Sequence, residues 1–409
     1  MNARSTSTGS VTPGISATAP AGTNPAPDGA ERDRLHHDVT RLLEFDRRTA
    51  TAGEYRSARY IADSLIAIGA KDVVLPIFRT HSSWVPPHLA HIAIGGLAAA
   101  IDHGAARTLG ALVTISYELE VSGRSQWIRR LIPARRGTSV TARIPAAGES
   151  HRTLVVVAHH DAAHTGWMWQ RSAVAGSQWL SRHTGRAIPS HAPTLAALAA
   201  TALPARAARI AGAAALAASA ALMVQSTRSR TTPGANDNAT GVAVGLELAR
   251  RLTTNPLPDT TVLLVFPGGE EVGNTGIRQW LRQNRRQLDP EATLVINLDA
   301  VGSRGPLAVA HRESLTNPLS KRAVQRARQC AAELGIELRT RAIPNATDAV
   351  GLTHAGLTTI SLLSDEHGWI SHLHRTSDTI DQVDWHTVSQ AAALTEHIAT
   401  TWATEGNQQ

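Results

Sequence analysis

Apolar positions along the chain fall either into short continuous runs or into a helical spacing. Four runs rich in valine, leucine and isoleucine predict buried β-strands, at Thr153 to Ala158, Thr260 to Phe266, Thr293 to Leu298 and Thr358 to Leu363. Helical spacing between and after them predicts helices at Gly241 to Leu252, Ile277 to Asn284, Asn317 to Leu334 and Trp385 to Trp402. This alternation predicts an α/β fold, a three-layer α/β/α arrangement around a central mixed, mostly parallel sheet.

The beginning of the chain has a different composition. Serine, threonine, proline, alanine and glycine dominate the first residues, so we expect residues 1 to 33 to be disordered and recognise no cleavable signal peptide. Helical spacing starts near Arg34 and predicts two helices that end at Gly69, followed by a strand from Val73 to Phe78. Residues 34 to 409 are therefore predicted to form one domain.

Two blocks interrupt this domain, residues 82 to 136 and residues 165 to 231. Each block holds two apolar stretches separated by a short charged break, which predicts two inserted apolar helical hairpins. The stretches are Leu89 to Ile101 with Leu109 to Ile115, and Leu195 to Leu203 with Ile210 to Val224. The longest stretch is shorter than the ~20 residues that a membrane span needs. Helices packed against the rest of the domain and membrane insertion are both open, so we expect a cytoplasmic or membrane-associated protein.

The positive charge of the chain does not point to nucleic acid. The formal net charge is +7, and Lys71 and Lys321 are the only lysines, so the cations are almost all arginine. The arginines gather in small groups beside the apolar stretches, which is typical of membrane-flanking charges or solvated helix ends rather than of phosphate contacts. We therefore expect no nucleic-acid partner. Cys330 is the single cysteine and cannot form an internal disulfide.

Histidine and carboxylate residues follow three of the predicted strands. His159 and Asp161 follow the first strand, Glu270 and Glu271 the second, and Asp299 the third. In open α/β sheets ligands bind beyond the carboxyl ends of the strands, so these side chains should share one rim of the sheet. Imidazole and carboxylate groups bind zinc, and one of two adjacent acids can bind metal while the other takes a proton from water.

Two further segments offer candidate ligands. Asp237 opens a helix of small residues, where it can either cap the helix or bridge two cations. His374 follows the last strand with a carboxylate, Asp378, four residues later. His367 and His372 lie close to His374 in sequence, so the identity of the late histidine stays open.

Five segments of the chain thus carry candidate ligands, around His159, Asp237, Glu270 and Glu271, Asp299 and His374. With its segments in this order, the chain resembles the zinc exopeptidases that include bacterial leucyl aminopeptidase, aminopeptidase S and glutamate carboxypeptidase. The resemblance covers residues 35 to 78, 138 to 166 and 232 to 400 and leaves out the tail and both hairpin blocks. It implies two zinc ions per chain. One would be bound by His159 and Asp299, the other by Glu271 and His374, and Asp237 would bridge them.

The resemblance also implies a mechanism. Glu270 would be the general base that takes a proton from zinc-bound water and returns it to the leaving amine. Asp161 would orient His159, and the peptide bond between Asp237 and Asn238 would be cis. The expected activity is removal of N-terminal residues from peptides or aminoacyl amides.

Two positions depart from the family pattern on the substrate side. Leu373 stands where some relatives have a tyrosine, and Thr347-Asp348-Ala349 lacks the histidine that often follows this aspartate. Two other functions are therefore weighed: a glutaminyl-cyclase-like acyltransferase with a single zinc, and a binding protein without catalysis on the same scaffold. The sequence does not fix the oligomeric state.

Overall fold

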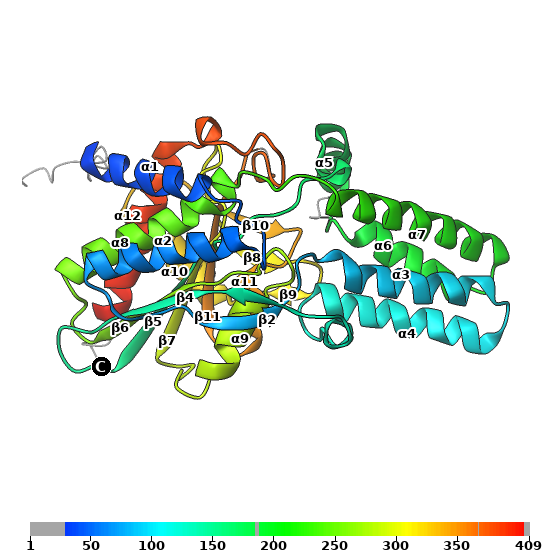
Figure 1. Ribbon diagram of the computed structural model, residues 1–409. Coiled ribbons are helices and arrows are strands. Elements are labelled where there is room, and N and C mark those ends of the chain that lie inside the picture. The colour runs from blue at the N-terminus through cyan, green and yellow to red at the C-terminus, as the bar shows by residue number, and fades with distance from the viewer. Residues whose placement is uncertain (1–28, 185–187, 367, 405–409) are drawn as a thin grey trace, which may run out of the picture.

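A nine-stranded mixed sheet lies at the centre of the protein. The structure, a computed structural model, describes residues 29–184, 188–366 and 368–404 (Figure 1). The strands are β1 (Lys71–Val74), β4 (Val140–Ile144), β5 (Arg152–Val157), β6 (Thr260–Phe266), β7 (Thr293–Leu298), β8 (Leu307–Glu313), β9 (Asn317–Pro318), β10 (Leu338–Ile343) and β11 (Thr358–Ser364). Their order across the sheet is β1-β4-β6-β5-β7-β11-β8-β10, and β9 pairs with β8.

The middle of the sheet is parallel and its margins are largely antiparallel. β6, β5, β7 and β11 run in one direction. β4 is antiparallel to β6, β1 to β4 and β8 to β11, while β10 is parallel to β8. The predicted mixed sheet is confirmed, with its parallel part confined mainly to the centre. Because parallel strands have their carboxyl ends at the same edge, the residues after β5, β6 and β7 meet at one rim.

Helices cover both faces of the sheet, as the alternation of apolar side chains requires. Leu154 and Val156 of β5 face a core shared with five helices, whereas Val155 and Val157 face a second core formed with two helices. The first layer contains α1 (Gly29–Leu43), α2 (Ala52–Ile68), α8 (Gly241–Thr254), α10 (Lys321–Glu333) and α12 (Trp385–Thr404). The second contains α9 (Thr275–Asn284) and α11 (Asp348–His354). The three-layer prediction is confirmed.

Several boundaries differ from the predictions. The strand expected from Val73 to Phe78 is wrong: it is divided at Pro76, which has no N–H to donate to a ladder, into β1 and β2 (Ile77–Thr80). β2 leaves the main sheet and pairs with β3 (Arg135–Thr138). The first residues of the helix expected from Asn317 form β9 instead. Most of the predicted tail lies outside the described residues, but Gly29 to Asp33 already belong to α1.

The two inserted blocks form helical hairpins that pack on each other. The first contains α3 (Val85–Ala100) and α4 (Gly104–Val121), and the second contains α6 (Ala192–Thr201) and α7 (Arg206–Thr227). Figure 1 shows the four helices projecting from the α/β body as one lobe, which we call the helical lobe. Val113, Tyr117, Leu198 and Leu216 belong to its core. The blocks also contain η1 (Ile128–Leu131), η2 (Trp167–Trp169) and α5 (Arg171–Thr184).

Glycines bring the helices of the lobe close together. An added Cβ at Gly95 of α3 would lie 2.4 Å from the Leu198 side chain of α6, and one at Gly110 of α4 would lie 2.7 Å from Thr201 Oγ1 of α6. Distances under 3 Å are not compatible with a side chain unless the neighbour moves. The sequence predicted the two hairpins, and these contacts join them into a single four-helix unit.

Candidate metal centre

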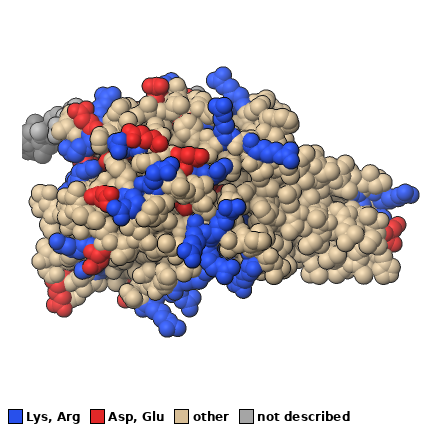
Figure 2. All heavy atoms as spheres, in the orientation of Figure 1, with Lys and Arg blue, Asp and Glu red and all other residues tan. Residues whose placement is uncertain are grey.

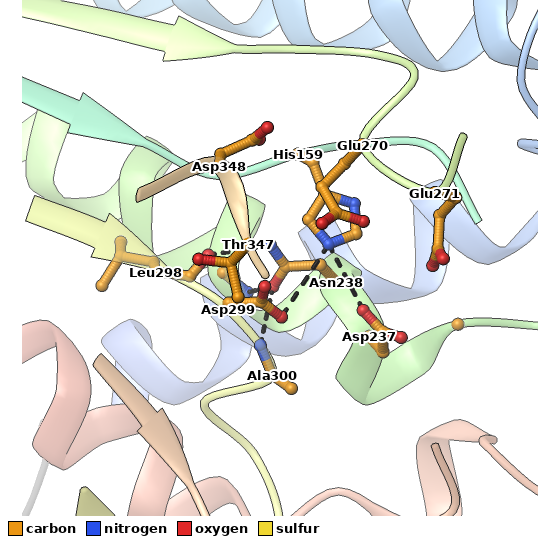
Figure 3. Close-up of polar contacts among 12 residues, drawn as sticks. His159, Asp237, Asn238, Glu270, Glu271, Leu298, Asp299, Ala300, Thr347 and Asp348 are labelled. Carbon is orange, nitrogen blue, oxygen red and sulfur yellow. Dashed lines mark hydrogen bonds and ion pairs between the residues drawn. The ribbon is translucent and has the colours of Figure 1, made fainter. Parts of the chain in front are cut away.

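The five predicted metal ligands lie together at the carboxyl rim of the parallel strands. His159 follows β5, Glu271 follows β6 and Asp299 follows β7, while Asp237 lies in the turn η3 (Ala235–Thr240) that opens α8. Figure 3 shows the side chains of these residues converging from separate strands and loops. His374 comes from the long loop after β11 and closes the site. The rim therefore gathers residues that are up to 215 positions apart in the chain (from 159 to 374).

Asp237 lies between two pairs of candidate ligands. Its Oδ1 is 3.3 Å from His159 Nε2, and that nitrogen is 3.9 Å from Asp299 Oδ1. Its Oδ2 is 3.2 Å from His374 Nε2, and that nitrogen is 3.2 Å from Glu271 Oε2. Each carboxylate oxygen of Asp237 thus faces one imidazole and one further carboxylate, the pairing that the sequence resemblance implied.

The chemistry of this group fits a divalent metal. Among the described residues, Asp237 Oδ2 and Glu271 Oε1 are buried without a hydrogen-bond partner, which is costly for a carboxylate that has no cation beside it. His159, Asp237 and Glu271 also present ligand atoms that lie within 4.8 Å of one another. Burial lowers the pKa of His374, but the Glu271 and Asp237 carboxylates outweigh burial and raise it to about 10. The centre therefore attracts positive charge, and nitrogen and oxygen donors of this kind suit zinc.

The loop that carries His374 distinguishes it from the neighbouring His372. His374 turns towards the centre, with a backbone φ of 53°, a value that residues other than glycine rarely adopt. His372 Nδ1 instead lies 2.7 Å from Ser377 Oγ in an exposed position. His367 is outside the described residues. Of the two histidines described, His374 alone is placed to bind a metal with Asp237.

Asp378 and Asn238 hold the Asp237 turn in place. The backbone amides of Asn236 and Asp237 donate to the two oxygens of Asp378, at 2.8 Å and 3.1 Å. Asn238 donates through Nδ2 to the Leu298 carbonyl at 2.8 Å and accepts through Oδ1 from the Ala300 amide at 3.1 Å. These bonds fix the turn to the end of β7. The Asp237–Asn238 peptide is cis, as the resemblance implied.

Asp161 contacts other groups in addition to His159. Its Oδ1 lies 3.6 Å from His159 Nδ1 and accepts from the Glu270 amide at 3.1 Å. Its Oδ2 accepts from the Glu271 amide at 3.3 Å and from Thr49 Oγ1 at 2.6 Å. Burial raises the pKa of Asp161, but the His159 and Thr49 contacts outweigh burial and lower it overall. Asp161 is therefore a positioning residue for both the histidine and the Glu270–Glu271 loop.

Glu270 is partly buried beside the centre and is held by an amide side chain. Asn274 Nδ2 donates to Glu270 Oε1 at 3.0 Å and to Asp348 Oδ1 at 3.3 Å. Burial is the main cause that raises the pKa of Glu270 well above its ordinary value, and the Glu271 and Asp348 carboxylates add to it. Asn274 was missed in the sequence, although its position four residues after Glu270 in the same loop is a local signal.

Other supporting residues were missed because their partners are distant in sequence. Arg47 is fully buried and donates to the carbonyl groups of His160, Pro233 and Gly234, which joins three loops around the centre. Arg129 donates to Glu120 of α4 and to the carbonyl of Val272, directly after Glu271. The helical lobe is thereby attached to the loop that carries Glu270 and Glu271.

A cavity of about 220 Å³ lies over the centre and has two different walls. One wall contains the predicted ligands and Glu270. The other comes from the base of the helical lobe and the loops beside it, with Trp84, Tyr117, Trp169 and Met223. Leu373, the residue that departs from the family pattern, also lines this cavity. The inserted blocks therefore shape the space in which a substrate would bind.

The buried carboxylate of Glu313 should make the unfolding free energy depend on pH. Its carboxylate accepts from the Thr347 amide at 2.8 Å and from Thr347 Oγ1 at 2.9 Å, just before Asp348. Burial raises the pKa of Glu313 from 4.5 to about 7, so this group stabilises the folded state fully below pH 4.5 and loses that contribution as the pH rises through 7. Relative to Glu313→Gln, the unfolding free energy of the unsubstituted chain should fall by roughly 3 kcal/mol over this range. Denaturant unfolding of both proteins near pH 5 and pH 8 measures it, and a pH-independent difference would contradict it.

Comparison with known proteins places the centre in a family. The sequence profile described as peptidase family M28 matches residues 218–399, a segment that includes Asp237, Glu270, Glu271, Asp299 and His374. The second half of the chain therefore contains an M28 peptidase domain. His159 and Asp161 precede the matched segment, but the structure joins them to it through β5. The M28 domain is that of a zinc metallopeptidase family, as the sequence resemblance predicted.

Curated relatives match only parts of this chain. Aminopeptidase YwaD of Bacillus subtilis is 24% identical over 169 residues, which cover 40% of this chain and 36% of YwaD. A probable zinc metalloprotease of Pyrenophora tritici-repentis is 39% identical over 71 residues, 17% of this chain and 14% of the relative. The matched segments thus span about a seventh to a third of these relatives.

Solved structures resemble this chain over most of its length. A leucine aminopeptidase precursor from Bacteroides thetaiotaomicron has a TM-score of 0.55 at 14% identity, and the alignment covers 92% of this chain and 98% of the precursor. A glutaminyl cyclase from the same organism has a TM-score of 0.56 at 13% identity, and the alignment covers 90% of this chain and 97% of the cyclase. At these identities the likeness establishes the fold, and the reaction has to be argued from the site.

Proposed function

We propose that this M28 protein is a two-zinc aminopeptidase that removes N-terminal residues from peptides. The observation that carries the proposal is the position of Asp237, whose two oxygens each face a separate imidazole and carboxylate pair. His159 and Asp299 would hold one ion, Glu271 and His374 the other, and Asp237 both. A bridging carboxylate reduces the repulsion between two close cations, which suits this arrangement.

Glu270 is proposed as the general base. Zinc, when bound, acts as a Lewis acid that polarises a carbonyl group and makes water easier to deprotonate. The Glu270 carboxylate accepts the proton of the attacking water and returns it to the leaving nitrogen. Asn274 holds the Oε1 atom in place, and burial with neighbouring acids gives Glu270 the raised pKa that a base working near neutral pH needs.

The cavity suggests which substrates fit. A free N-terminal ammonium group would be attracted by the group of buried carboxylates at the rim. The opposite wall presents the apolar side chains of Trp84, Trp169 and Met223, which favour an apolar substrate side chain. We therefore propose peptides or aminoacyl amides with a free amine and an apolar first residue as the substrates.

A glutaminyl-cyclase-like acyltransferase is the second candidate, because solved glutaminyl cyclases share the fold. That reading uses a single zinc, so the metal content and the product separate the two functions. A binding protein without catalysis is the third, and it predicts no turnover at all. The presence of Glu270 with its Asn274 partner favours catalysis.

Zinc content and a small substrate panel test the proposal. We expect about two zinc ions per purified chain and release of p-nitroaniline from leucyl p-nitroanilide. Acetyl-leucyl p-nitroanilide, with the same leaving group and a blocked amine, is the matched control and should not be cleaved. A chelator should abolish turnover, and added zinc should restore it.

Three outcomes would contradict the aminopeptidase. One zinc per chain with cyclisation of an N-terminal glutamine peptide would support the acyltransferase. Turnover of only the blocked substrate would reject recognition of a free amine. Zinc binding without turnover of any substrate in the panel would support the binding protein.

A further inference from the structure

The outer surface of the helical lobe is apolar, and no other described part of the chain covers it. Leu109, Leu112 and Ile115 recur every third residue along α4 and are exposed, the last two by 58% each. Leu97 of α3 and Ile210 of α7 are exposed in the same way. Soluble proteins rarely expose large continuous apolar surfaces, and such surfaces mark sites that contact a protein or a membrane.

Charges are confined to the two ends of the lobe. α3 and α6 contain no aspartate, glutamate, lysine or arginine. In α4 and α7 the charged residues are Arg107, Arg206 and Arg209 near the tip, and Glu118 and Glu120 near the base. Figure 2 shows the projecting lobe as a largely uncharged surface with charges at its far end and where it joins the body. This distribution is typical of a segment in contact with hydrocarbon.

α7 is unlike the core helix of a soluble protein. Its 22 residues are apolar enough to cross a membrane, yet only 22% of its apolar segment is buried in the protein. At 1.5 Å per residue it is about 33 Å long, close to the ~30 Å hydrocarbon thickness of a bilayer. A core helix of the same composition would be covered by other parts of the protein.

Exposed arginines surround the base of the lobe. They are Arg79 of β2, Arg130, Arg135 and Arg136 after α4, and Arg228 and Arg230 after α7. Among the described residues, none of these six forms an ion pair with an acid, and Figure 2 shows positive side chains gathered at this junction. Arg79 and Arg136 are directly opposite each other on β2 and β3, and like charges in this position repel. We call these six residues the arginine belt.

We propose that the helical lobe inserts into an anionic lipid bilayer, with the arginine belt in contact with the headgroups. The apolar faces then contact acyl chains, and the anionic headgroups neutralise the belt, including the opposed Arg79 and Arg136. A second copy of the chain covers the apolar faces less well, because two belts brought together repel each other. The inference is independent of the proposed peptidase activity.

The depth of the lobe in the bilayer can be measured with a single label. Cys330 is the only cysteine and is buried in α10, so Leu112→Cys introduces the one exposed thiol on the described surface. We expect an environment-sensitive dye at Leu112→Cys to shift its emission to shorter wavelength with vesicles of phosphatidylcholine and phosphatidylglycerol, and brominated acyl chains to quench it. Ile66→Cys on α2, at a site 61% exposed, is the matched control and should show neither effect.

Vesicle flotation tests the contribution of the arginine belt. Removing two cations that contact anionic lipid weakens membrane partition on the order of tenfold or more, so Arg135→Gln with Arg136→Gln should reduce flotation by that amount. Arg285→Gln with Arg286→Gln, an equally exposed pair after α9, is the control and should leave flotation unchanged.

The two experiments have outcomes that reject the proposal. Failure of the full chain to float with either neutral or anionic vesicles would overturn it. Equal signals from dyes at residues 112 and 66 would overturn the assignment of the lobe. Burial of the residue 112 dye in a dimer without lipid, at unchanged flotation, would instead assign the lobe to contact between copies of the chain.

Discussion

Glu270→Gln should lower kcat by about 10²–10⁴-fold while the zinc content stays unchanged. Glutamine has nearly the same shape and its carbonyl oxygen can still accept from Asn274, but it cannot take a proton from water. The loss therefore isolates proton transfer from the packing of the loop. Initial rates with leucyl p-nitroanilide at saturating substrate measure kcat, and metal analysis of the same preparation measures zinc.

The adjacent acid is the matched control for this experiment. Glu271 lies in the same loop, but its Oε2 is next to His374 in the second pair of candidate ligands. Glu271→Gln should therefore lose zinc together with activity. The two neighbouring substitutions separate the base from the ligand. Full turnover by Glu270→Gln would reject Glu270 as the base, and loss of zinc in both variants would show that the loop acts as one structural unit.

The core of the fold and the candidate ligands that directly follow strands were predictable because their signals are local. A continuous apolar run such as Val262 to Phe266 predicts a buried strand without knowledge of its neighbours. Parallel strands place their carboxyl ends together, so the acids and the histidine after three such runs had to share a rim. The order of the motifs then gave each of them a proposed role.

Residues that support the centre were harder to predict, because they act across long sequence separations. Arg47 binds carbonyl groups 113 to 187 residues away, and an isolated arginine beside a helix carries no local sign of this. The division at Pro76 similarly depends on which strand each half finds as a partner. Hydrophobic periodicity gives the elements, whereas these contacts depend on how the elements are arranged in three dimensions.

The joining of the two hairpins was also beyond local patterns, and it links the lobe to the chemistry. Each hairpin looked like a separate insertion, but their close packing through Gly95 and Gly110 makes one unit with one base. That base lines the cavity opposite the candidate metal centre. If the lobe is inserted in a bilayer, the cavity lies near the level of the lipid headgroups.

Arg129 is a buried link between lobe and centre, and Arg129→Met should destabilise the protein by about 3–5 kcal/mol. Arg129 and Glu120 are 7% and 2% exposed, so loss of the guanidinium leaves the Glu120 carboxylate buried without its cation. The same change removes the donor to the Val272 carbonyl, which should loosen the loop at Glu271 and weaken zinc binding. Unfolding by denaturant and zinc retention during dialysis measure the two effects.

Arg130→Met is the matched control, because the neighbouring arginine is exposed and the same substitution there should change the unfolding free energy by no more than about 0.5 kcal/mol. The double substitution Glu120→Met with Arg129→Met should recover part of the loss, since no unpaired buried charge remains. Its zinc retention should stay low, because methionine cannot donate to Val272. Equal unfolding free energies for the residue 129 and 130 variants would show that this ion pair does not anchor the lobe.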